Sequence, residues 1–164
     1  MRTYPNRYVQ HTQGQIIAIA LLYARVLQIT VNPPFVGARQ MKEGSDQKQD
    51  MLHVFGAKWK NIGKLDYVCA WYKKATDLMT AASVRAALVS TNSVSQGDAV
   101  ATLWKPLLEE GVHIDFAHRT FIWDSEASLK AHVHCVIIGF SIAPSTKTKT
   151  IFDDDMSVIA ENIN

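Results

Sequence analysis

Apolar positions along the chain fall into short runs that are typical of strands. Leu27–Val31 is rich in β-branched residues, and 86–90 and 132–140 are apolar nearly throughout, as expected for strands buried on both faces of a sheet. A longer segment, His113–Trp123, alternates loosely between apolar and polar residues, which favours a further strand. The pattern therefore predicts four strands.

Helical patterns separate these strands. From 65 to 79, apolar residues recur at three- and four-residue steps with charged residues on the opposite side, which predicts an amphipathic helix. The segment 15–27 is apolar at nearly every position and predicts a buried helix that leads into the first strand. A third helix is predicted at 95–108, with Gly97 near its start and Pro106 near its end.

The alternation of strands and helices predicts an α/β fold with one mixed, doubly wound sheet. At 164 residues and 48% hydrophobic, the chain is long enough for one core and needs no second domain. We expect 1–31 to form an N-terminal helix and the first strand, and 32–142 to form the main α/β unit. Over 143–164, proline, a Ser/Thr/Lys cluster and consecutive aspartates indicate a tail that leaves the domain.

Charge and cysteine content indicate the cellular compartment of the protein but do not identify a binding partner. The formal net charge is only +2, although eight basic residues face four acidic ones between Arg39 and Lys74, which fits either phosphate contacts or a solvated face. Cys69 and Cys135 lie inside apolar runs, as buried thiols in a reducing compartment do. The apolar run 16–22 is too short to span a membrane. A cytoplasmic protein without a membrane partner is expected.

The tetrapeptide Asn32-Pro33-Pro34-Phe35 is the most informative turn in the sequence. Two consecutive prolines fix the backbone and remove two N–H donors, so the turn presents acceptors. The exocyclic amine of adenine is a donor, and its lone pair is delocalised into the ring. Acceptance of its hydrogens by the Asn32 side chain and the Pro33 carbonyl would align the amine with a sulfonium methyl group, without a strong base.

This reading has two structural consequences and one ordinary alternative. Phe35 would stack on the base, and the base would have to leave the duplex to reach the turn. Two prolines and an aromatic residue after a strand also form a plain rigid turn, and the tetrapeptide by itself does not decide between the two.

Four blocks together resemble the methyltransferase region of the MmeI-like type II restriction-modification enzymes. They are 32–37 (Asn-Pro-Pro-Phe-Val-Gly), 65–72 (Leu-Asp-Tyr-Val-Cys-Ala-Trp-Tyr), 87–97 and 113–124, and their order and spacing match as well. The resemblance covers 32–164. It implies the catalytic half of a class I, Rossmann-like methyltransferase that transfers a methyl group from S-adenosylmethionine to the N6 of adenine in DNA, with 143–164 leading towards a target-recognition region.

The resemblance also implies roles for individual residues. Asn32, Pro33, Pro34 and Phe35 carry the catalytic motif, and Asn32 and Pro33 also contact the cofactor. Within the segment 116–121 (Phe-Ala-His-Arg-Thr-Phe), Phe121 is the candidate for a second contact to the flipped base and Arg119 for a contact to phosphate. These six residues make up the predicted site.

The chain departs from the family pattern ahead of Asn32. The glycine-rich turn that cradles the methionine moiety and the acid that binds the ribose are expected there, but Gly14 is the sole glycine before Asn32 and no acid precedes Glu43. A fragment of a larger enzyme is therefore expected, one that binds S-adenosylmethionine weakly or not at all when isolated and binds DNA only in the complete enzyme.

Two other readings come from different classes of function. His113, His118, His132 and His134 with Cys135 suggest zinc, but the ligands are not at the spacing of common sites, so no metal is predicted. A non-catalytic interaction module is the stronger alternative. Because the first strand would be an unpaired edge, we expect it to pair with a second copy or with a complementing chain.

Overall fold

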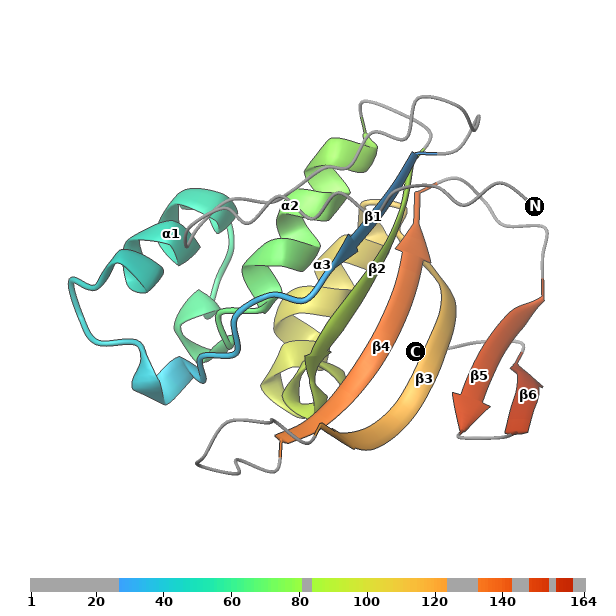
Figure 1. The fold of residues 1–164 in the computed structure, drawn as a ribbon. Coiled ribbons are helices and arrows are strands. Elements are labelled where there is room, and N and C mark those ends of the chain that lie inside the picture. The colour runs from blue at the N-terminus through green and yellow to red at the C-terminus, as the bar shows by residue number, and fades with distance from the viewer. Residues whose placement is uncertain (1–26, 81–83, 124–132, 143–147, 154–155, 161–164) are drawn as a thin grey trace, which may run out of the picture.

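A computed structural model describes residues 27–80, 84–123, 133–142, 148–153 and 156–160 (Figure 1). The strands are β1 (Leu27–Val31), β2 (Val84–Thr91), β3 (His113–Trp123), β4 (Val133–Ser141), β5 (Lys149–Asp153) and β6 (Met156–Ala160). The α-helices are α1 (Asp46–Phe55), α2 (Cys69–Met79) and α3 (Lys105–Glu109). Short 3-10 helices occupy Ala38–Gln40, Ile62–Lys64 and Asn92–Ser95. The helix predicted over 15–27 lies outside the described residues except for Leu27, which is the first residue of β1.

All the described strands join one mixed sheet in the order β1-β2-β4-β3-β5-β6. β1 is parallel to β2, β4 inserts antiparallel between β2 and β3, and β5 is parallel to β3. The prediction of an α/β fold with one mixed sheet and its four strands is confirmed, whereas the helices on both faces that a doubly wound sheet requires are not seen among the described residues. The described helices lie on one side of this sheet (Figure 1), and β1 is its edge among the described strands, as the sequence predicts.

The segment predicted as one helix at 95–108 forms a π-helix that continues directly into a short α-helix. A π-helix occupies Val100–Trp104 and α3 follows directly. Proline removes one backbone N–H and its ring collides with the preceding turn, so Pro106 in the first turn of α3 explains why regular α-helical bonding does not continue through this segment. The interruption places Trp104 in the core, where its indole N–H donates to the Val94 carbonyl at 2.8 Å.

The core lies between the helices and the sheet. Tyr72 of α2 stacks on Phe140 of β4 with ring centroids 5.2 Å apart and meets Trp104 edge-on at 5.1 Å. On the opposite face of the sheet Phe116 covers Gly139, where an added Cβ would lie 2.0 Å from the phenyl ring. A side chain at 139 would therefore displace Phe116 from the sheet.

The hairpin formed by β5 and β6 was not expected from the sequence. Residues 149–160 pair with β3 through β5 and extend the sheet, although they lie in the segment predicted as a tail. Both strands have five residues, and short strands at an edge carry a weak pattern. The assignment of 143–164 as a link to another region stays a prediction.

Candidate active site

The turn 32–35 lies at the carboxyl edge of the sheet. Because β1 and β2 are parallel and adjacent, their carboxyl ends meet at the same edge, which is where open α/β sheets bind ligands. Val31 pairs with Leu88, so Asn32 follows at the level of the last residues of β2. The turn therefore stands beside the polar segment that follows β2.

The four residues of the turn have different surroundings. Pro33 is buried, and Phe35 is half-buried and packs against the core, whereas Asn32 and Pro34 are exposed. The turn is thus anchored through an apolar ring at one position and leaves the Asn32 amide at the surface. This arrangement offers an acceptor to a ligand without the cost of burying an unpartnered polar group.

A carboxylate joins the segment after this turn to the end of β2. Asp66 Oδ1 accepts the Ala38 backbone N–H at 2.7 Å, and Asp66 Oδ2 accepts the Ser93 hydroxyl. The next residue, Tyr67, donates its backbone N–H to the Val36 carbonyl at 2.9 Å. Sequence reasoning missed this cluster, although Asp66 belongs to the 65–72 block.

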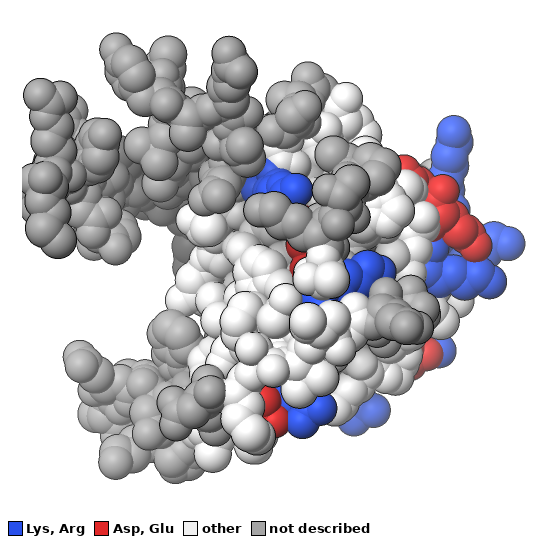
Figure 2. Space-filling view, turned by 90° about the vertical axis from the view of Figure 1, so that its right-hand side faces the viewer, with Lys and Arg blue, Asp and Glu red and all other residues white. Residues whose placement is uncertain are grey.

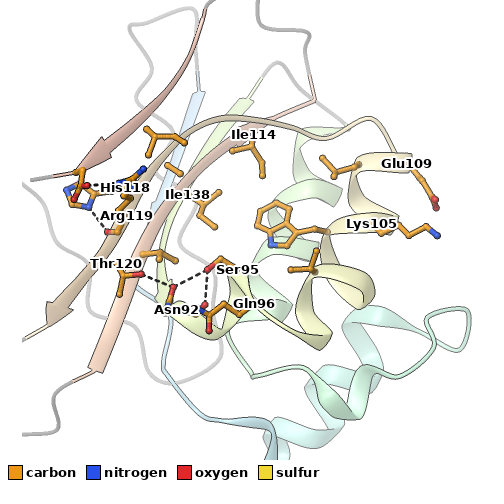
Figure 3. Close-up of a pocket in the computed structure, with 17 residues that line it drawn as sticks. Asn92, Ser95, Gln96, Lys105, Glu109, Ile114, His118, Arg119, Thr120 and Ile138 are labelled. Carbon is orange, nitrogen blue, oxygen red and sulfur yellow. Dashed lines mark hydrogen bonds and ion pairs between the residues drawn. The ribbon is translucent and has the colours of Figure 1, made fainter. Parts of the chain in front are cut away.

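The end of β2 is also tied to β3. Asn92 Oδ1 accepts hydrogen bonds from the Thr120 hydroxyl at 3.0 Å and the Ser95 hydroxyl at 3.1 Å (Figure 3). Side-chain hydrogen bonds therefore link the segment after the 32–35 turn to the end of β2, and the end of β2 to β3.

Phe121 lies at the same edge but on a different strand from the turn. Cys135 of β4 pairs with Thr91 on one side and with Phe121 on the other, which places these residues in one row across the sheet. Two strands lie between β3 and β1, a separation of about 14 Å at ~4.8 Å per strand. Phe121 is half-buried and its ring meets His118 edge-on at 5.4 Å.

A cavity of about 840 Å³ opens between the π-helix, α3 and the strands β3 to β5 (Figure 3). Its lining includes Asn92, Arg119 and Thr120, but not the turn 32–35 or Phe121. Arg119 forms an ion pair with Asp153 at 2.8 Å, and Lys105 and Glu109 balance each other on the opposite wall. These charges cancel, so the cavity does not favour phosphate.

The surface viewed from the side of the β5–β6 hairpin is mostly uncharged (Figure 2). Where Lys and Arg occur in this view, Asp and Glu lie close to several of them (Figure 2). The described residues on this face form no broad basic patch of the kind that binds a nucleic-acid backbone.

The described thiols and phenols near the edge are poor acids. Burial, assisted by the charge of Asp66, raises the pKa of Cys69 to about 12. Burial likewise raises the pKa of Tyr72, whose hydroxyl shares a hydrogen bond with Ser90 at 2.6 Å. Both groups stay protonated at neutral pH, so neither is an activated nucleophile.

The described residues show neither a metal centre nor a membrane-spanning helix. No group of three or more His, Cys, Asp or Glu side chains within that part of the chain is placed to hold a metal ion; His132 lies outside it. None of the helices in the described ranges is long and apolar enough to cross a membrane.

Comparison with known proteins gives matches to DNA methyltransferases. Residues 8–153 match the family model described as "MmeI, DNA-methyltransferase domain". DNA methyltransferase A of Bacillus subtilis (strain 168) is 38% identical over 133 residues, which cover 81% of this chain and 15% of that protein.

A solved structure gives the same answer for the fold. The type IIL restriction-modification enzyme MmeI in complex with DNA superposes with a TM-score of 0.74 at 47% identity, over 83% of this chain and 19% of that chain. The chain spans less than a fifth of either relative. Its sheet and helices correspond to part of a methyltransferase domain, and the chain belongs to the MmeI DNA-methyltransferase domain family.

Proposed function

We propose that this chain supplies the catalytic turn for transfer of a methyl group from S-adenosylmethionine to the N6 of a flipped adenine in DNA, as part of a restriction-modification system in the cytoplasm. The observation that carries the proposal is the turn itself: Asn32 is exposed at the carboxyl edge while Pro33 anchors the backbone. Membership of a DNA-methyltransferase family supports the reaction class.

The chemistry needs positioned acceptors more than a base. The Asn32 amide oxygen and the Pro33 carbonyl accept the two hydrogens of the amine, which returns electron density to nitrogen as the methyl group arrives. Deprotonation can follow methyl transfer, with the proton passing to water, because the methylated ammonium is a strong acid. The raised pKa values of Cys69 and Tyr72 agree with a site that uses no strong base from these groups.

Phe35 and Phe121 are the proposed contacts to the flipped base, by stacking. Arg119 is proposed to reach a DNA phosphate, for which it must leave its exposed ion pair with Asp153. Because exposed ion pairs contribute little stability, breaking this pair costs little free energy. Asn32 and Pro33 are also the proposed contacts to the cofactor.

We propose that the isolated chain binds S-adenosylmethionine weakly or not at all, because a glycine-rich cradle is absent from the sequence before Asn32. Isothermal titration calorimetry tests this with the chain alone and with the chain joined to a cofactor-binding half from a family member. The joined protein should bind and methylate DNA. Micromolar affinity in the isolated chain would show that the cofactor contacts lie elsewhere.

A non-catalytic interaction module is the second candidate. The observation in its favour is that β1 is an edge of the described sheet, whose outer backbone groups pair with no other described strand. In this reading the chain forms a homo-oligomer or complements another chain. A joined protein that folds and binds the cofactor but never methylates DNA would favour it.

A further inference from the structure

We propose that Asp66 is a positioning residue that fixes the direction of the 32–35 turn relative to the end of β2. The inference rests on the proposed function for its catalytic consequence, whereas the hydrogen bonds that carry it stand independently. Asp66 precedes α2 and is half-buried between the two carboxyl-edge segments. Its two oxygens accept from different segments, Ala38 on one side and Ser93 on the other.

The carboxylate of Asp66 connects residues that are distant in sequence. Ala38 and Ser93 lie 28 and 27 residues from Asp66 in sequence, so the carboxylate joins three segments that are far apart in the chain. The backbone bond from Tyr67 to Val36 fixes the same segment one step closer to the turn. Together the two contacts restrain 36–38, which leaves the short stretch 32–35 held at both ends.

We call the hydrogen bonds from Ala38 and Ser93 to the Asp66 carboxylate the clamp. Its Ser93 side is held by further hydrogen bonds. The Ser93 hydroxyl lies 2.8 Å from the Thr91 hydroxyl, within hydrogen-bond distance, and Asn92 between them is bonded to Thr120 of β3. Movement of Asp66 would therefore shift the position of the 32–35 turn relative to the carboxyl ends of β2 and β3. Charge-assisted hydrogen bonds such as those of a carboxylate are among the stronger ones in proteins.

The contacts that hold α2 to the sheet are independent of the Asp66 carboxylate. α2 is held to the sheet by buried Tyr72 and its contacts with Ser90 and Phe140, none of which involves Asp66. Loss of the carboxylate should therefore loosen the turn and leave α2 and the sheet in place.

Amide hydrogen exchange of the 164-residue chain, measured by NMR, tests the clamp without any reaction. In Asp66→Asn, which keeps the side-chain shape and removes the charge, the Ala38 amide should exchange faster by on the order of tenfold to a hundredfold. Core amides of β2 and β4 should keep their rates. Asp98→Asn is the control, since among the described residues the Asp98 carboxylate pairs with exposed Lys64 and not with the 36–38 segment, and it should leave the Ala38 rate unchanged.

Ser93 supplies a matched pair of variants. Ser93→Ala removes the hydroxyl that Asp66 accepts, whereas Ser93→Thr retains one. Alanine should reproduce part of the Ala38 effect and threonine should restore the wild-type rate. Equal acceleration of all amides in Asp66→Asn would overturn the proposal in favour of a general stabilising role, and an unchanged Ala38 rate would overturn the clamp.

The catalytic half of the proposal is read in the joined protein that carries a cofactor-binding half. Asp66→Asn should lower kcat for DNA methylation about tenfold or more and leave KM for DNA within about twofold, because the turn is misplaced while phosphate contacts remain. A change in KM alone would overturn the positioning role. If exchange behaves as expected but the wild-type joined protein never methylates DNA, the clamp stands and the proposed function fails.

Discussion

The two outer strands of the described sheet, β1 and β6, differ in how the residues at the edge are held and covered. β1 leads into a turn whose backbone is anchored by buried Pro33 and whose following segment is bonded to Asp66. β6 exposes Met156, Val158 and Ile159, each more than half accessible. The comparison teaches that the carboxyl end of β1 is fixed by hydrogen bonds and a buried ring, whereas β6 is held by strand pairing with β5 and leaves apolar side chains exposed.

The largest expected effect is at the ordered edge. In the joined protein, Asn32→Ala should lower the rate of methyl transfer on the order of a hundredfold to a thousandfold, by analogy with the loss of one preorganised oxyanion-hole donor. DNA affinity and the fold should persist, because Asn32 is exposed and its proposed contacts are to the amine and the cofactor, not to the DNA backbone. Initial-rate assays check this, with exposed Gln40→Ala as the control. A near-normal rate in Asn32→Ala would move the catalytic site elsewhere.

Support beneath the edge can be removed at Tyr72. Tyr72→Phe deletes the hydroxyl that shares a hydrogen bond with buried Ser90, which should reduce the free energy of unfolding by ~1–3 kcal/mol because a buried polar group loses its partner. Urea denaturation measures it. Tyr67→Phe is the matched control, since the Tyr67 hydroxyl donates to the carboxylate of exposed Asp50, and it should cost less. Equal losses would contradict the ranking.

Phe35→Ala should be milder for the reaction than Asn32→Ala. Stacking on a base contributes ~1–3 kcal/mol, so capture of the flipped adenine should weaken, seen as a raised KM and a reduced fluorescence signal from 2-aminopurine at the target. Phe35→Tyr retains a ring and should restore capture. If the alanine variant lowered kcat as strongly as Asn32→Ala with KM unchanged, stacking would not be the role of Phe35.

The smallest effect concerns association through β1. We predict that the chain forms a dimer or larger assembly, and that amide exchange in Leu27–Val31 slows as concentration rises while exchange in Met156–Ala160 does not. Sedimentation velocity gives the assembly state. A monomer at high concentration, or concentration-dependent protection confined to β6, would contradict pairing through β1.

Much of the fold was predictable because its signals are local. The strands at 86–90 and 132–140 were found because continuous apolar runs are typical of central strands, and α2 because its periodicity is strong. β5 and β6 were missed because Asp153 and its acidic neighbours interrupt two short apolar segments. The Asp66 cluster depends on contacts across 27 and 28 residues, which no local pattern contains.

Identification of the methylated base is the most direct test of the central claim. The joined protein and its Asn32→Ala variant are incubated with DNA and isotopically labelled S-adenosylmethionine, and the digested nucleosides are separated by mass spectrometry. The account predicts label in N6-methyladenine from the wild-type turn, and label reduced by about a hundredfold or more in the variant. Label in a methylated cytosine, or equal N6-methyladenine from both proteins, would contradict it.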